Sequence, residues 1–111
     1  MLISKLKAKH DELMNTKLPH EEVAKLLQEG AFLVDVRSKL EACLGMAPGA
    51  TNISLFRLKR RMDELPRDRN IVLYCGTGGR AGKAKQVLEA EGFKVFNGGG
   101  YQDVLKSLGT H

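Results

Sequence analysis

The stretch that decides the fold reads Ile71-Val-Leu-Tyr-Cys75-Gly-Thr-Gly-Gly-Arg80-Ala81. Its first five residues are an unbroken apolar run, which predicts a strand buried on both faces. The glycines after Cys75 predict a tight turn, and a helix is expected from about Ala81 to Glu91. A buried strand that turns directly into a helix is typical of α/β proteins, whose reactive groups gather where such strands end.

The same alternation of strands and helices extends in both directions from this stretch. It predicts an α/β fold in three layers, with a mainly parallel central sheet between helices. Residues 1–17 are expected to form an N-terminal amphipathic helical extension, and residues 18–111 the domain itself. The other predicted strands are Ala31 to Val36, Thr51 to Ile53 and Phe93 to Phe96, and Asn97 to Gly100 is predicted to be a loop. The other predicted helices lie between Pro19 and Gly30, from Ser38 to Leu44, from Ser54 to Pro66, and after Tyr101.

Composition excludes several classes of function. A chain of 111 residues suits one domain, and no apolar run approaches the ~20 residues of a membrane helix. No signal peptide is visible, so a cytoplasmic location is expected. Two cysteines and three scattered histidines predict neither a metal site nor another cofactor.

The net charge of +5 favours an anionic ligand of some kind. The basic residues are densest from Arg57 to Arg61, followed by Arg67 and Arg69. A solvated helix face explains this run better than a nucleic-acid patch, so we predict neither nucleic-acid nor membrane binding.

The loop after Cys75 is suited to a nucleophilic sulfur. Its glycines let successive amide N–H groups turn inward as an anion-binding nest, and the following helix adds partial positive charge. Arg80 can add a full positive charge. Each effect favours thiolate over thiol. The alternative, an inert buried cysteine before an ordinary glycine turn, does not explain why all these features coincide.

Two nucleotide-binding patterns fit the same letters only in part. Gly76-x-Gly78-x-x-Ala81 matches a dinucleotide fingerprint, but no acidic residue ends the next predicted strand and only 14 residues follow Asn97. The P-loop pattern fails because Thr77 replaces its first glycine and Ala84 its Ser/Thr.

Four motifs follow one another along the chain: Leu33 to Arg37, Glu41 with Gly45 to Ile53, Cys75 to Arg80, and Asn97 to Gly99. Together they resemble the single-domain rhodanese-like sulfurtransferases, over roughly Leu18 to Leu108. Met46 stands where this family usually has a histidine.

This resemblance implies a sulfurtransferase that forms a persulfide on Cys75. The donor would be a small anion such as thiosulfate, and the acceptor cyanide or a thiol. Arg80 and Lys83 would bind the donor, while Asp35 and Arg37 would fix the loop geometry, with an Arg37–Glu41 ion pair. Five residues of the loop would stabilise the persulfide: Gly76, Thr77, Gly78, Gly79 and Arg80.

Three other functions stay open at this point. Cysteine-dependent phosphatases and arsenate reductases use one more residue between Cys and Arg, so the shorter loop disfavours them. A partner-binding module without activity is disfavoured because Cys75 is present. A persulfide relay could pass sulfur to an acidic protein that docks on Arg57 to Arg61.

Cys43 is expected to be a small buried hydrophobe rather than a resolving thiol.

Overall fold

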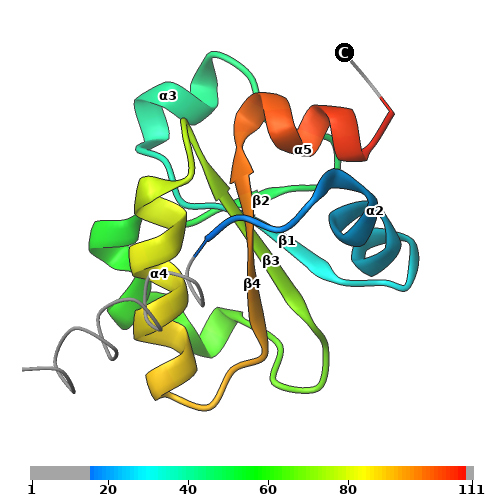
Figure 1. Cartoon of the computed structure of the whole chain (residues 1–111). Coiled ribbons are helices and arrows are strands. Elements are labelled where there is room, and N and C mark those ends of the chain that lie inside the picture. Colours follow the sequence, from blue (N-terminus) through cyan, green and yellow to red (C-terminus); the bar gives the residue numbers. More distant parts are fainter. Residues whose placement is uncertain (1–15, 110–111) are drawn as a thin grey trace, which may run out of the picture.

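Four parallel strands form the centre of the fold (Figure 1). The structure is a computed structural model, and it describes residues 16–109. The strands follow the spatial order β2-β1-β3-β4, so β3 lies inside the sheet between β1 and β4. Their bounds are β1 Phe32–Asp35, β2 Thr51–Asn52, β3 Ile71–Cys75 and β4 Val95–Gly100.

Helices cover both faces of this sheet, which confirms the three-layer α/β fold. The helix pair η1 and α4 lies on one face, and α2 and α5 lie together on the other (Figure 1). The helices are α2 His20–Gln28, α3 Lys39–Cys43, the 3₁₀ helix η1 Leu55–Glu64, α4 Gly79–Ala90 and α5 Tyr101–Ser107.

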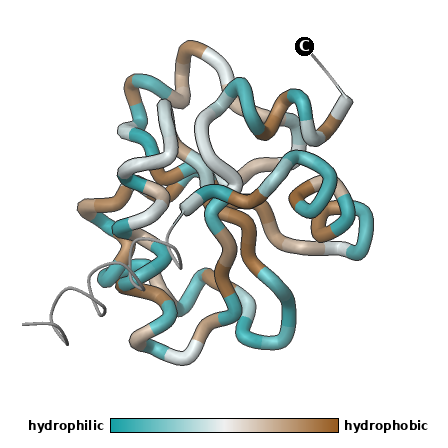
Figure 2. Tube along the Cα trace, viewed as in Figure 1, coloured by the Kyte–Doolittle hydropathy of each residue, from teal (hydrophilic) through white to brown (hydrophobic). Residues whose placement is uncertain are grey.

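The alternation of side chains along β3 divides the core into two clusters. Ile71, Leu73 and Cys75 pack toward η1 and α4, whereas Val72 and Tyr74 pack toward α2 and α5. All five are buried, as their uninterrupted apolar sequence predicts. Figure 2 shows the hydrophobic colour concentrated on these central strands, with hydrophilic residues along the outer helices and loops.

The strand predicted from Phe93 to Phe96 exists but begins two residues later, and the loop predicted from Asn97 to Gly100 is wrong because it continues this strand. β4 begins at Val95 and continues to Gly100, which pairs with Cys75 after an irregularity in register. The physical reason is that the glycines bring β4 closer to β3 and its loop than any side chain would allow. A Cβ on Gly98 would lie 2.8 Å from Val72 Cγ1, and a Cβ on Gly100 would overlap the Gly76 carbonyl oxygen.

The predicted N-terminal helix falls mostly on residues 1–15, which lie outside the described residues, so the boundary near residue 18 stays a prediction. Lys17 and Leu18 contact the domain, with the Leu18 amide donating to the Asn97 carbonyl oxygen at 2.9 Å. No helix within residues 16–109 has the length and apolar character to cross a membrane.

Candidate active site

Cys75 lies at the carboxyl end of β3, directly under the N-terminus of α4. Its side chain is almost fully buried, with the residue 1% exposed, and its Sγ accepts a hydrogen bond from the Gly78 amide at 2.9 Å. Gly78 has φ +107°, a conformation that glycine adopts without strain. α4 begins at Gly79, two residues earlier than predicted, so the helix terminus is closer in sequence to the sulfur. The first amides of a helix have no intrahelical acceptor, so they are available to an anion at this position.

Arg80 in the first turn of α4 forms an ion pair with Glu41 of α3. Its two terminal nitrogens contact Glu41 Oε1 and Oε2 at 2.6 and 2.9 Å. This contact lowers the pKa of Glu41 to about 2 and raises the pKa of Arg80, to which the neighbouring Cys75 contributes a smaller part. The guanidinium is therefore held in place by Glu41 in the neighbourhood of Cys75.

The ion pair predicted between Arg37 and Glu41 is wrong. Glu41 turns to Arg80 instead, while the Arg37 guanidinium bonds the buried carboxylate of Asp35 at 2.7–3.1 Å. Arg37 also donates to the Gly45 carbonyl oxygen at 2.6 Å and stacks 4.7 Å from the centre of the Tyr101 ring. Asp35 is closer along the chain and wholly desolvated, so it needs a permanent cation more than the half-exposed Glu41 does.

Tyr74 joins this buried pair to the segment that follows α3. Its hydroxyl donates to Asp35 Oδ2 at 2.9 Å and accepts from the Ala47 amide at 3.0 Å. Burial raises the pKa of Tyr74 to about 12, so the hydroxyl keeps the proton that it donates. Asp35 and Arg37 thus fix the segment from Gly45 to Ala47 and, through Tyr74, the strand that carries Cys75.

Asn97 holds the loop from the side of β4. Its side-chain amide donates to the Gly78 carbonyl oxygen at 3.2 Å, and its Oδ1 accepts from the Gly99 amide at 2.8 Å. The Gly78 carbonyl also accepts the first helical bond of α4, from Gly82. Asn97 therefore fixes the residue whose amide contacts the sulfur.

The other residues singled out in the sequence lie at the surface. Gly76, Thr77 and Gly79 are exposed on the loop above Cys75, and Lys83 is exposed on α4. Cys43 is exposed on α3, so the prediction that it is a buried hydrophobe is wrong. α3 buries Ala42 instead, and so its next residue faces solvent.

The arrangement concentrates positive potential on one sulfur atom. The Gly78 amide contacts Sγ, α4 begins four residues after Cys75, and the Arg80 guanidinium in its first turn is held by Glu41. In general, such a setting can hold an anionic sulfur, the form in which a cysteine acts as a nucleophile.

Comparison with known proteins assigns the chain to a family. The model of the rhodanese-like domain matches residues 19–107. The chain belongs to the rhodanese-like family. A sulfurtransferase of Allochromatium vinosum is 37% identical over 70 residues, which cover 62% of this chain and 65% of that protein. A thiosulfate sulfurtransferase of Escherichia coli is 34% identical over 74 residues, 64% of this chain and 71% of that one.

Solved rhodanese-like structures agree with the observed sheet. The human single-domain sulfurtransferase superposes with a TM-score of 0.70 at 27% identity, over 81% of this chain and 95% of that one.

Two residues that contact the loop after Cys75 are not among the site residues that the sequence predicts. The sequence places Glu41 in a motif but predicts the wrong partner for it, and it places Asn97 only in a glycine turn. An asparagine directly before three glycines is the sequence signal that could have identified Asn97, because its side chain satisfies the amides that such a turn exposes.

Proposed function

We propose that this protein transfers sulfane sulfur through a persulfide on Cys75. The observation that carries the proposal is the contact between Cys75 Sγ and the Gly78 amide at 2.9 Å, in a loop that leads directly into α4. The names of the Allochromatium and Escherichia coli relatives support sulfur transfer as the class of reaction.

In the first half-reaction, the Cys75 thiolate attacks the outer sulfur of a donor such as thiosulfate. A bond forms between Cys75 Sγ and that sulfur, the sulfur–sulfur bond of thiosulfate breaks, and sulfite leaves with the electron pair. The outer sulfur is left as a persulfide whose negative charge the loop amides stabilise. Arg80 and the exposed Lys83 supply the positive charge that attracts the anionic donor.

In the second half-reaction, cyanide or a thiolate attacks the outer sulfur of the persulfide. The sulfur passes to the acceptor and Cys75 leaves as the thiolate, so the enzyme returns to its starting state without an external redox partner. Two half-reactions that share one covalent intermediate predict ping-pong kinetics.

The dimensions of the loop favour sulfur over phosphate. Only four residues separate Cys75 from Arg80. Two of them have a place already, because the Gly78 amide contacts the sulfur and Gly79 is the first residue of α4. A tetrahedral oxyanion needs a ring of amides around four oxygens, and this loop has its amide contact on the sulfur itself. We therefore rank phosphatase and arsenate reductase chemistry below sulfur transfer.

Mass spectrometry of the intact protein after thiosulfate treatment tests the proposal. We expect a gain of about 32 Da, one sulfur atom, located on Cys75. Cys75→Ser should lack the adduct and lose turnover of thiosulfate with cyanide, because an alcohol at this position forms no persulfide. Cys43→Ser is the matched control and should keep both. An adduct on Cys43 alone, or turnover by Cys75→Ser within about tenfold of the wild type, would disprove the mechanism.

A further inference from the structure

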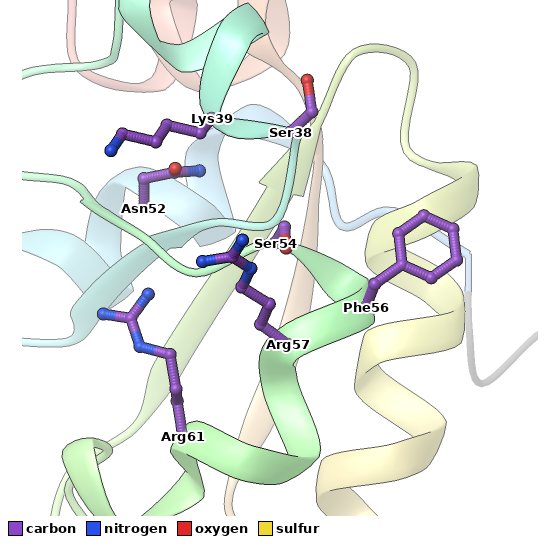
Figure 3. Close-up of a pocket in the computed structure, with 7 residues that line it drawn as sticks. All are labelled: Ser38, Lys39, Asn52, Ser54, Phe56, Arg57 and Arg61. Atoms are coloured by element: carbon purple, nitrogen blue, oxygen red, sulfur yellow. The ribbon is translucent and has the colours of Figure 1, made fainter.

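A cationic hollow of about 540 Å³ lies beside the site, between the start of α3 and η1 (Figure 3). Figure 3 shows the charged ends of Lys39, Arg57 and Arg61 around Asn52, with Phe56 pointing away from them. Ser38 and Ser54 complete the lining. The hollow thus combines three cations with neutral polar groups, and none of its lining residues is acidic.

Lys39 and Arg57 are the two cations of the hollow whose charge is not used within the described part of the fold. Both are exposed, and neither forms an ion pair with any residue from 16 to 109. Arg61 is partly neutralised by Glu64, at 2.7 Å. In contrast, Arg67 stacks 4.1 Å from the Phe93 ring centre, and Arg69 donates to the Gly30 carbonyl oxygen. Arg67 and Arg69 are therefore structural, whereas Arg57 of the basic run and Lys39 of α3 present open charges to the hollow.

The hollow is close enough to Cys75 for one partner to cover both. Asn52 is in register with Asp35 on β1, and Asp35 is in register with Tyr74, the neighbour of Cys75. Two strand spacings separate Asn52 from Tyr74, roughly 10 Å. α3 bridges the same gap, because Lys39 lines the hollow while Glu41 contacts Arg80 of the active-site loop.

Large apolar side chains are exposed on the two elements that bound the hollow, α3 with its C-terminal cap and η1. Leu40 and Leu44 are 76% and 87% exposed, and Phe56 is 92% exposed. The leucines are four residues apart at α3, so they share one face of it. Leu40 directly follows Lys39 and Phe56 directly precedes Arg57, so exposed apolar side chains flank the cations of the hollow, as is typical of a protein interaction surface.

We propose that this surface, consisting of Lys39, Leu40, Leu44, Phe56 and Arg57, docks an acidic protein segment that carries the acceptor thiol. Carboxylates of the segment occupy the cationic hollow, and its apolar residues cover the leucines and Phe56. The inference rests on the proposed function, because the docked thiolate attacks the outer sulfur of the Cys75 persulfide. The bond from Cys75 Sγ to that sulfur breaks, Cys75 keeps the electron pair, and the sulfur becomes a persulfide on the partner.

Two features of the surface favour protein over nucleic acid. The exposed leucines of α3 and its C-terminal cap find no apolar group to pack against in the charged sugar-phosphate backbone of RNA. They pack well against the apolar residues of a protein. Phe56 is the one aromatic side chain in the lining of the hollow, and it points away from the cations, so bases stacked on it would leave their phosphates far from Arg57.

The test compares two synthetic peptides as sulfur acceptors. One carries a single cysteine flanked by leucines and several glutamates, and its twin has glutamine in place of each glutamate. The protein is first converted to the Cys75 persulfide with thiosulfate and freed of sulfite. The rate of its discharge by each peptide is then followed by intact mass. We expect the acidic peptide to react at least about tenfold faster at low ionic strength, and the advantage to shrink as salt is added.

Charge-reversal variants show whether the preference for the acidic peptide depends on the hollow. Arg57→Glu should bring the ratio of the two rates close to one, and Lys39→Glu should lower it as well. Arg60→Glu changes the net charge by the same amount on the same helix, but Arg60 is exposed and does not line the hollow. It should therefore keep most of the wild-type ratio. Circular dichroism verifies that each variant is folded.

The outcomes separate this inference from the proposed function. If Cys75 gains no sulfur, the proposed function fails and the docking proposal fails with it. If the persulfide forms but both peptides discharge it equally fast, only the docking proposal is overturned. It is also overturned if Arg57→Glu and Arg60→Glu lower the ratio alike, since the effect would then be net charge. Binding of a fluorescent single-stranded RNA that Arg57→Glu abolishes, without discrimination between the peptides, would assign the hollow to nucleic acid instead.

Discussion

The Glu41 carboxylate and the Arg80 guanidinium form a two-point ion pair, at 2.6 and 2.9 Å, that joins α3 to the active-site loop. Ser38 caps α3 and hydrogen-bonds the same carboxylate, so the carboxylate is fixed from both sides. Arg80 cannot turn toward solvent without breaking this pair. The position of the positive charge next to Cys75 therefore depends on a residue of another helix.

The first prediction concerns the acid stability that this pair confers. Arg80 above all, with help from Ser38, lowers the pKa of Glu41 from 4.5 to about 2. A carboxyl whose pKa is lower in the folded state stabilises the fold above its unfolded pKa and loses that contribution as pH falls toward the folded pKa. Glu41→Gln should therefore show a smaller decrease in the free energy of unfolding between about pH 4.5 and pH 2 than the wild type.

Denaturant titrations across that pH range measure the difference. Asp103 has a pKa of about 2 as well: burial alone would raise it, but hydrogen bonds from His20, the Gly100 amide and Lys17 outweigh burial. Asp103→Asn is thus the comparison variant, because it removes a second carboxyl that titrates in the same window away from Arg80. Only Glu41→Gln should also lower thiosulfate turnover at neutral pH through Arg80. An unchanged pH dependence of stability in Glu41→Gln would show that the pair is not formed in solution.

The second prediction concerns the close contact between Gly100 and Gly76. A Cβ on Gly100 would overlap the Gly76 carbonyl oxygen and come within 3.2 Å of Thr77 Cα, all of it backbone that cannot move aside cheaply. Gly100→Ala should cost about 1–3 kcal/mol of stability, as overpacking does. It should also lower sulfur transfer, because the loop above Cys75 must shift.

Gly79→Ala provides the stability control for this substitution. A Cβ there meets nothing within 4 Å, and Gly79 is the first residue of α4. Alanine in a helix is generally more favourable than glycine, so stability should be kept or slightly raised. If Gly100→Ala has the same free energy of unfolding as the wild type in chemical denaturation, β4 does not pack closely against the backbone of Gly76 and Thr77, contrary to the prediction.

Features of the fold that depend on local sequence were predicted, whereas those that depend on tertiary contacts were not. The apolar run of β3 and the alternation of elements were sufficient to predict the fold, because both are local patterns. The glycines after Cys75 indicate a nucleophile by the same kind of local pattern, and that assignment stays a prediction. The extent of β4 was missed because three consecutive glycines read as a loop, and only the tertiary approach of the active-site loop makes them a strand. The partner of Glu41 was missed for a similar reason. Arg37 is near in sequence, but the choice between it and Arg80 depends on the desolvation of Asp35.

The third prediction separates the two cysteines by their reactivity. Cys43 is exposed and Cys75 is 1% exposed, so a bulky thiol reagent should modify Cys43 first in the folded protein. Cys43→Ala should keep turnover of thiosulfate with cyanide, and its stability should change by no more than about 0.5 kcal/mol, as for other surface substitutions. Loss of turnover with an unchanged circular dichroism spectrum would instead give Cys43 a part in the reaction.

The last prediction tests the length of the active-site loop, which distinguishes sulfur from phosphate chemistry. Gly78 contacts the sulfur through its amide, and its carbonyl oxygen accepts bonds from both Gly82 and Asn97. One glycine inserted between Gly78 and Gly79 would separate the sulfur contact from the start of α4, so the two could no longer occupy their present positions together. Loss of one preorganised donor costs about 100-fold in rate in other enzymes. We therefore expect thiosulfate turnover to fall by about that factor, while the wild type shows negligible activity on aryl phosphates. Unimpaired sulfur transfer by the insertion variant, or efficient hydrolysis of aryl phosphates by the wild type, would refute the assignment of this loop to sulfur.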